Sequence, residues 1–171
     1  MKKIFLLIFT ILLYNFSVAQ LFSKRKANKD TEKWRYEVIC MGEGKETNYT
    51  VKVFSFSKKP KVATEQAKKN AVHAIVFQGV NAGPCTSQDP LLKNPNAKDE
   101  KKEYWDAFFA DGGKYMKFVT ASNNGRVRPE DVSKISKKEF KIGVIVSVDV
   151  EGLRQELEAS GILQNLGNIF K

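Results

Sequence analysis

Side chains that commonly carry out chemistry are sparse in this sequence. Its one histidine, His73, lies between Val72 and Ala74 in a segment with helical periodicity. One histidine and two distant cysteines do not form a zinc-binding pattern, and no nucleophile motif accompanies the histidine. Gly42 and Gly44 lack the lysine and the following helix of a phosphate-binding loop. We therefore predict no catalytic residue, no metal ligand and no cofactor, and interpret His73 as a structural or solvated side chain.

Acidic pairs are the remaining candidates for catalysis. Asp106 and Asp111 could face a cleft, as the two carboxylates of a glycosidase do. Acidic side chains lie on the surface or near helix ends far more often than they act in catalysis. A hydrolase with a hidden site therefore stays as the second alternative to a binding function.

Large aromatic residues gather at one point of the chain. Tyr104, Trp105, Phe108 and Phe109 occupy positions i, i+1, i+4 and i+5 of a predicted helix, so they share one face of that helix. Such a stripe is typical of a helix that faces the core. The alternative is that the four rings form a contact surface for a partner.

Hydrophobic periodicity predicts the elements that must position these residues. Alternating apolar residues indicate strands at 34–41, 49–57, 114–120 and 140–150. Helical spacing indicates helices at 62–77, 99–110 and 153–160, the second capped by Asp99. Between them lie a long proline-bearing loop at 80–97 and a polar segment at 126–136 that we predict to be irregular.

This order, β-β-α-α-β-β-α, predicts an α+β fold. We expect one antiparallel sheet of about four strands, made of two hairpins, with helices packed on one face. The strand at 140–150 has the clearest alternation, and 114–120 is its expected neighbour. One domain covers residues 34–160, and a tail follows at 161–171.

The two cysteines, Cys40 and Cys85, fit this topology. If the first strand runs up, the second runs down and the helix runs up again, both cysteines lie at the same end. We predict a disulfide between them. The alternatives are a buried free Cys40 with an exposed Cys85, or a bond between two molecules.

The N-terminus has the three parts of a secretory signal peptide. Lys2 and Lys3 precede an apolar run of about ten residues, too short to span a membrane. Small residues then precede a cleavage site between Ala19 and Gln20. We predict a signal peptide at 1–19, a flexible polar leader at 20–33 and no transmembrane segment after cleavage. The expected location is the periplasm or cell envelope, where disulfides persist.

The excess of basic over acidic residues points to anionic partners. Loss of Lys2 and Lys3 lowers the formal net charge from +10 to +8. Outside the cytoplasm we expect no nucleic acid, and an acidic protein face or an anionic glycan or lipid is a better candidate. The lysines are scattered in pairs, so the alternative is that they only keep the protein soluble.

Three segments together carry a family resemblance. They are the alanine-spaced helix at 62–72, the segment 113–119, and the valine strand at 140–150 followed by Leu153 and Leu157. Over about residues 34–160 the chain resembles the small N-terminal α+β domain of the flagellar assembly protein T family and related envelope lipoproteins. The resemblance implies an accessory envelope protein that binds other proteins, without a catalytic motif. The long 80–98 insertion and the missing lipid-anchor cysteine are departures from that pattern.

These observations favour a non-catalytic module that binds an envelope protein in a larger assembly. The first alternative is a basic protein that binds cell wall, glycan or lipid. We expect the assembly module to expose an apolar patch, either at 80–110 or in the 162–171 tail.

Overall fold

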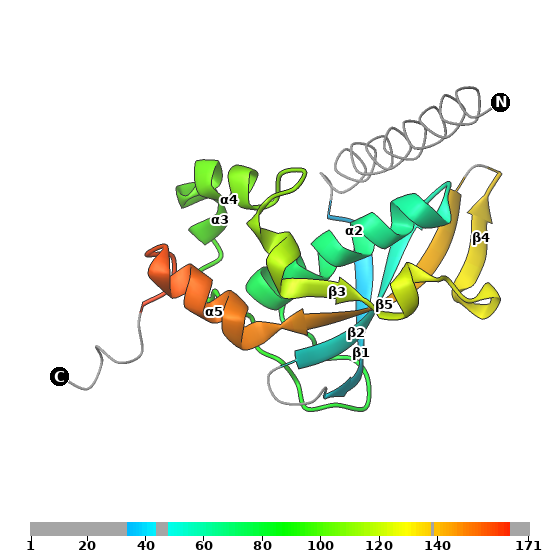
Figure 1. The fold of residues 1–171 in the computed structure, drawn as a ribbon, viewed down its shortest axis with the longest axis horizontal. Helices are drawn as coiled ribbons and strands as arrows, with labels where there is room; N and C mark the ends of the chain where they lie inside the picture. Colours follow the sequence, from blue (N-terminus) through cyan, green and yellow to red (C-terminus); the bar gives the residue numbers. More distant parts are fainter. Residues whose placement is uncertain (1–33, 44–47, 138, 165–171) are drawn as a thin grey trace, which may run out of the picture.

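The computed structural model describes residues 34–43, 48–137 and 139–164. It has the α+β architecture predicted from the sequence, with helices packed against one antiparallel sheet (Figure 1). The strand order is β1-β2-β5-β3, and β4 also pairs with β5. The predicted signal peptide, its cleavage site and the leader lie outside the described residues, as does the tail beyond residue 164.

The first hairpin confirms the two predicted N-terminal strands. β1 (Tyr36–Glu43) and β2 (Asn48–Ser57) pair in antiparallel register. Along β2, buried and half-exposed side chains alternate, because successive residues face the core and the outer surface in turn. Val51 and Val53 are fully buried beneath the helical layer.

The helix predicted at 62–77 begins slightly earlier than expected, and its last turn is a π-helix. α2 (Pro60–His73) continues directly into the π-helical η1 (Ala74–Gln78). The alanine seam packs inwards, with Ala63, Ala67 and Ala71 fully buried. Small side chains allow a helix to lie close to its neighbour, so this seam brings α2 onto the sheet.

The carbonyls of η1 hold the loop that follows. The Ile75 oxygen accepts from the Leu91 N–H at 3.0 Å, and the Val76 oxygen accepts from the Leu92 N–H at 2.9 Å. The helix that the sequence places at 99–110 is two short helices, α3 (Ala97–Glu100) and α4 (Lys102–Phe108). The first of these helices starts before Asp99, so the predicted N-terminal cap at Asp99 is wrong. Lys101 separates the two helices.

Two predictions for the next segment need correction. Most of the predicted strand at 114–120 is a 3-10 helix, η2 (Lys114–Phe118), and only β3 (Val119–Ala121) is extended. After two more 3-10 turns, η3 (Ser122–Gly125) and η4 (Pro129–Asp131), the polar segment predicted to be irregular contains β4 (Val132–Ser136). All five residues of β4 are exposed, which removes the alternation that marks a half-buried strand.

β5 (Glu139–Asp149) is the central strand of the sheet. Its predicted core face is buried from Ile142 to Val148 at every second residue. It pairs with β2 along its whole length on one side, and with β4 and β3 in succession on the other. The segment predicted to be the neighbour of β5, 114–120, thus contributes to only three residue pairs, through β3. Most residue pairs of β5 are made with β2.

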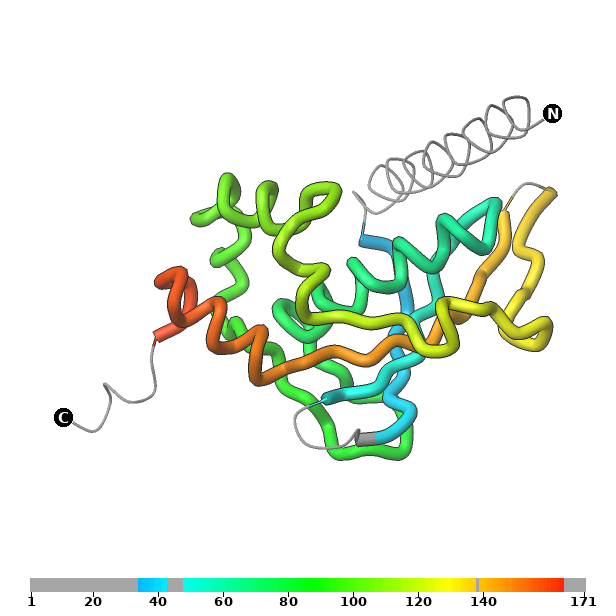
Figure 2. The backbone as a smooth tube through the Cα atoms, in the orientation of Figure 1, coloured from blue at the N-terminus to red at the C-terminus, as the bar shows by residue number. Residues whose placement is uncertain are grey.

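The last predicted helix is confirmed, although it begins three residues earlier than expected. α5 (Val150–Ala159) is capped by Asp149, whose Oδ1 accepts the Gly152 N–H at 2.9 Å, a typical N-terminal cap. Leu153 and Leu157 are fully buried on its inner face. The backbone tube in Figure 2 shows α5 continuing directly from β5 at the end of the molecule opposite to β4.

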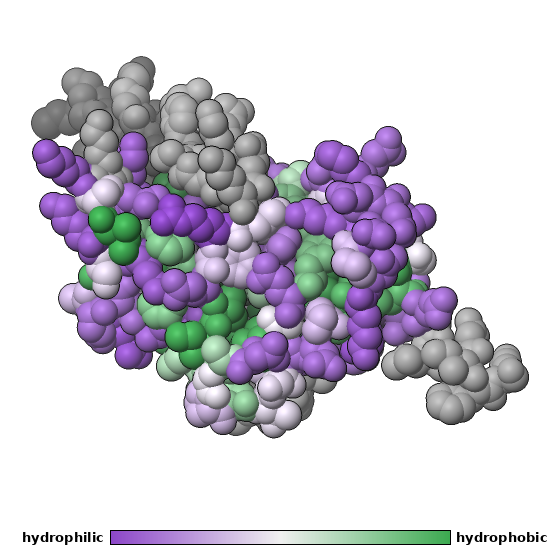
Figure 3. Space-filling view, turned by 180° about the vertical axis from the view of Figure 1, so that it is seen from behind, coloured by the Kyte–Doolittle hydropathy of each residue, from purple (hydrophilic) through white to green (hydrophobic). Residues whose placement is uncertain are grey.

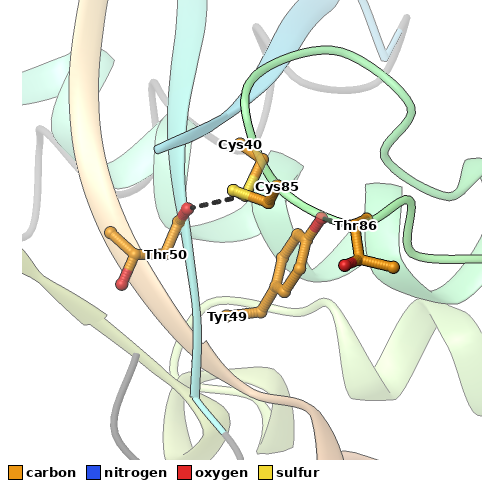
Figure 4. The surroundings of a disulfide bond; sticks show 5 residues. All are labelled: Cys40, Tyr49, Thr50, Cys85 and Thr86. Atoms are coloured by element: carbon orange, nitrogen blue, oxygen red, sulfur yellow. Dashed lines mark hydrogen bonds between the residues drawn. A yellow bond between two sulfur atoms is a disulfide. The ribbon is translucent and has the colours of Figure 1, made fainter. Parts of the chain in front are cut away.

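The predicted disulfide between Cys40 and Cys85 is present (Figure 4). Beside it, the Tyr49 hydroxyl donates to the Thr86 carbonyl at 2.7 Å. A bridged sulfur carries no hydrogen, so the 3.7 Å approach of Cys40 Sγ to the Thr50 carbonyl is a contact, not a donated hydrogen bond. The bridge and the tyrosine together fasten the loop after η1 to the first hairpin.

Gly83 lets this loop lie directly on β1. Its φ is +113°, and an added Cβ would lie 2.3 Å from the Cys40 carbonyl oxygen. The neighbouring Ala82 carbonyl accepts the Cys40 N–H at 2.7 Å. The outward backbone of β1 is therefore covered at this point, and a side chain at position 83 would separate loop and strand.

Gly83→Ala is expected to lower the free energy of unfolding by about 1–2 kcal/mol, because the left-handed backbone and the clash both oppose it. Urea unfolding measures the change. Gly112→Ala is the control, since its φ is +75° but no atom lies within 4 Å of the added Cβ. Equal losses in the two variants would show that close packing on β1 contributes nothing.

Candidate functional site

β4 forms part of the outer edge of the sheet beyond β5. Val132 and Ile135, at 37% and 50% exposure, are two of the three large apolar side chains that are exposed among the described residues, and Met41 on β1 is the third. Figure 1 shows β4 at the end of the sheet away from α5. Exposed apolar side chains on a strand with a free edge are typical of a surface that pairs with another chain.

Among the described strands, β1, β3 and β4 each pair with only one neighbour, and the edges of β1 and β4 differ in how they are covered. The backbone of β1 is partly covered, because Ala82 accepts the Cys40 N–H and the disulfide holds that loop in place. For β4, no backbone hydrogen bond in the described ranges joins Val132, Lys134 or Ile135 to any element other than β5. In an edge strand, the N–H and C=O groups of every second residue point away from the sheet. On β4 these groups can form hydrogen bonds with an incoming strand.

Charge at this edge is positive. Lys134 lies on β4 and Lys137 in the turn after it, and both are exposed. Neither takes part in the ion pairs found among the described residues. A register shift between Lys134 and Ser136 bends the strand. The edge therefore suits a short acidic strand, and the lysines oppose pairing with a second copy of β4.

The outer face of the sheet is an apolar surface largely covered by its own charged residues. Arg35 lies 3.9 Å above the Phe56 ring and pairs with Glu139 at 3.3 Å. Lys141 lies 4.7 Å above the Phe54 ring and pairs with Glu37 at 2.5 Å. Figure 3 views the molecule from behind and shows apolar patches interrupted by hydrophilic side chains.

A partly buried ion pair crosses the same face. Lys52 Nζ lies 2.8 Å from Asp131 Oδ1, and these side chains are 17% and 9% exposed. Asp131 fits here because Gly143 on β5 leaves room beside it. The charges on this face are thus matched among themselves, so it is a weaker candidate for an acidic partner than β4.

The aromatic stripe belongs to the core. Trp105, Phe108 and Phe109 are 2%, 2% and 5% exposed, and Tyr104 is partly buried beside them. Trp105 Nε1 donates to the Ala97 carbonyl at 3.2 Å. Their interpretation as core residues holds, and the alternative of a partner surface is wrong for the three buried rings, since they already pack within the domain. None of the large apolar side chains that are exposed among the described residues lies at 80–110. The other expected location, the tail at 162–171, lies outside the described residues from residue 165 onwards.

His73 is a buried structural side chain. Its ring stacks on Trp34 with centroids 3.7 Å apart. Lys98 Nζ lies 3.4 Å from Nε2, and the Tyr36 hydroxyl lies 2.7 Å from Nδ1. An ammonium can only donate, so Nε2 accepts and the Nδ1–H donates to the tyrosine oxygen. Burial, together with the charges of Lys98 and Lys69, lowers the pKa of His73 to about 3.

The two acids considered for hydrolysis are both exposed. Asp106 is exposed and pairs with Lys102 one helical turn away, and Asp111 is exposed after α4. No group of three potential metal ligands lies together within the described part of the chain. None of the helices in those ranges has the length and apolar content needed to cross a membrane.

Sequence reasoning missed the β4 edge, because its five residues are exposed on both faces. The one available signal was the pair of apolar residues, Val132 and Ile135, within an otherwise polar segment. Comparison with known proteins finds no matching protein family, curated protein or solved structure.

Proposed function

We propose that this protein is an exported, non-catalytic module of the cell envelope that binds a partner protein through β4. The observation that carries the proposal is the open edge of β4 with exposed Val132 and Ile135. Addition of a partner strand to such an edge supplies main-chain hydrogen bonds, while alternate side chains give specificity. The apolar pair would be covered by the partner strand.

The lysines at this edge favour an acidic partner. Opposite charges attract across paired strands and like charges repel, so Lys134 and Lys137 favour acidic residues on the incoming strand. They also disfavour pairing of two copies of this chain, whose formal net charge after the predicted cleavage is +8. Specificity then comes from repulsion of the wrong partner as well as attraction of the right one.

Export is supported by two independent features. The N-terminal sequence has the pattern of a signal peptide. The Cys40–Cys85 disulfide fits an oxidising compartment, where such bonds persist. An envelope location would expose β4 to other envelope proteins.

Replacement of both apolar residues of β4 is expected to weaken partner binding at least tenfold, or about 1.4 kcal/mol. The variant Val132→Thr/Ile135→Thr keeps residues that favour strands and should fold normally, because both side chains are exposed. Met41→Thr is the matched control, since Met41 is 43% exposed on the opposite edge. Photo-crosslinking from position 135 in envelope extracts identifies the partner, and its affinity is then measured for each variant.

Three results would contradict the proposal. The first is a partner that is retained equally by the β4 variant and the control. The second is crosslinking from position 135 to no protein at all. The third is recovery of only glycan or lipid that is lost as salt rises, which would favour the electrostatic alternative.

A further inference from the structure

A second surface lies between α2 and the segment after β3, which run side by side in Figure 2. It is a half-open groove with a volume of about 540 Å³, within the range of small-molecule sites. Its described lining comes from the first half of α2 and from the segment around η3, and includes Lys61, Glu65, Lys68, Met116, Arg126 and Val127.

The groove has an excess of positive charge. Three basic residues, Lys61, Lys68 and Arg126, line it with a single acid, Glu65. Glu65 is engaged by Lys68 at 3.1 Å. No ion pair among the described residues involves Lys61 or Arg126. This contrasts with the outer sheet face, where the basic residues are matched by acids, and it leaves two cations available to a ligand.

The two walls are held together by direct contacts. The Thr64 hydroxyl lies 3.1 Å from the Gly125 carbonyl oxygen. Gly125 has a φ of +71°, and an added Cβ would lie 2.4 Å from Thr64 Cγ2. The preceding Asn123 and Asn124 are also left-handed, with φ of 51° and 55°. The groove is therefore shaped before a ligand arrives, which lowers the cost of binding.

Two half-buried side chains add apolar surface to this basic site. Met116 and Val127 line the groove and pack against the hydrophobic core. Arginine binds planar carboxylates and phosphates through two parallel N–H donors, and lysine adds a point charge. The combination suits a small anion that also carries an apolar portion.

We infer that this groove binds a carboxylate- or phosphate-bearing ligand, with Arg126 and Lys61 contacting the anionic group and Met116 and Val127 contacting its apolar part. The site is separate from β4 and does not depend on the proposed strand pairing. The anion could be free or could belong to a larger molecule, and both present the same group to the two cations.

The test uses protein purified after expression of the whole sequence. Titration with inorganic phosphate, citrate and a short glutamate-rich peptide is followed by NMR chemical shifts and calorimetry. We expect saturable shifts in the groove around residues 61–68 and 124–127, and an affinity that falls as salt rises. Tighter binding of phosphate or of citrate identifies the preferred free anion, and tighter binding of the peptide indicates a polymer-borne carboxylate.

Variants separate a shaped site from general charge attraction. Arg126→Ala and Lys61→Ala are each expected to weaken binding about threefold to tenfold. Lys93→Ala removes the same charge from an exposed position outside the groove and should change affinity little. Gly125→Ala keeps every charge but displaces a wall, and should also weaken binding.

Two results would overturn the inference. One is equal weakening by Lys93→Ala and Arg126→Ala, which would indicate nonspecific attraction. The other is the absence of saturable shifts in the groove with all three probes. Because Lys61 and Arg126 are exposed, their variants should fold, and unchanged thermal unfolding confirms this.

Discussion

Loss of the Cys40–Cys85 disulfide is expected to lower the free energy of unfolding by about 4 kcal/mol. The bridge joins residues 45 positions apart, and the entropy of closing a loop of that length gives this magnitude. The loss should appear as a large drop in the denaturant midpoint of the reduced protein. Stabilities of small domains are commonly about 5–15 kcal/mol, so the reduced protein would be only marginally folded.

The double variant Cys40→Ser/Cys85→Ser tests the same bond without a reductant. It should match the reduced wild type and should not respond to added reductant. The Tyr49 hydrogen bond to the Thr86 carbonyl is a second fastening of this loop, and Tyr49→Phe removes it alone. A double cysteine variant as stable as the oxidised wild type would contradict the prediction.

Acidification is expected to destabilise the protein between pH 7 and pH 4, with about 3 kcal/mol of the loss due to His73. The pKa of His73 falls from 6.5 to about 3 in the folded state, so below pH 6.5 the unfolded chain binds a proton that the folded protein does not. Its full contribution is present above pH 6.5 and is lost as the pH falls towards 3. The slope is about 1.4 kcal/mol per pH unit.

The variant His73→Gln isolates this contribution. Glutamine can still accept from Lys98, but it does not titrate, so the slope from pH 6.5 to 5 should largely disappear. His73 is the one histidine of the sequence, and most carboxyl groups titrate below this window. Urea unfolding at a series of pH values gives the comparison, and equal slopes in both proteins would refute the assignment.

The central strand and the disulfide could be predicted because each leaves a local or topological mark. Strict alternation along β5 requires one buried face. The pairing of Cys40 with Cys85 followed from the direction of two strands and one helix. The burial of Trp105 and Phe108 likewise agreed with the helical spacing of the aromatic stripe.

Other features depend on context that the sequence does not display. β4 is exposed on both faces, so its residues show no period of two. Tyr115, Met116 and Phe118 suit either a strand or a 3-10 turn, and packing against the core decides between them. The groove combines residues near 61–68 with residues near 124–127, and neither segment contains a recognisable binding motif.

The central place of β5 has a consequence for the order in which the molecule is assembled during synthesis. Val51 on β2 pairs with Val146 on β5, so β2 lacks this neighbour until nearly the whole chain has been made. Both cysteines emerge much earlier, and the bridge can close around the first hairpin and α2 before the sheet is complete. Folding is thereby divided into an early local stage, secured by oxidation, and a late stage in which one strand joins three others.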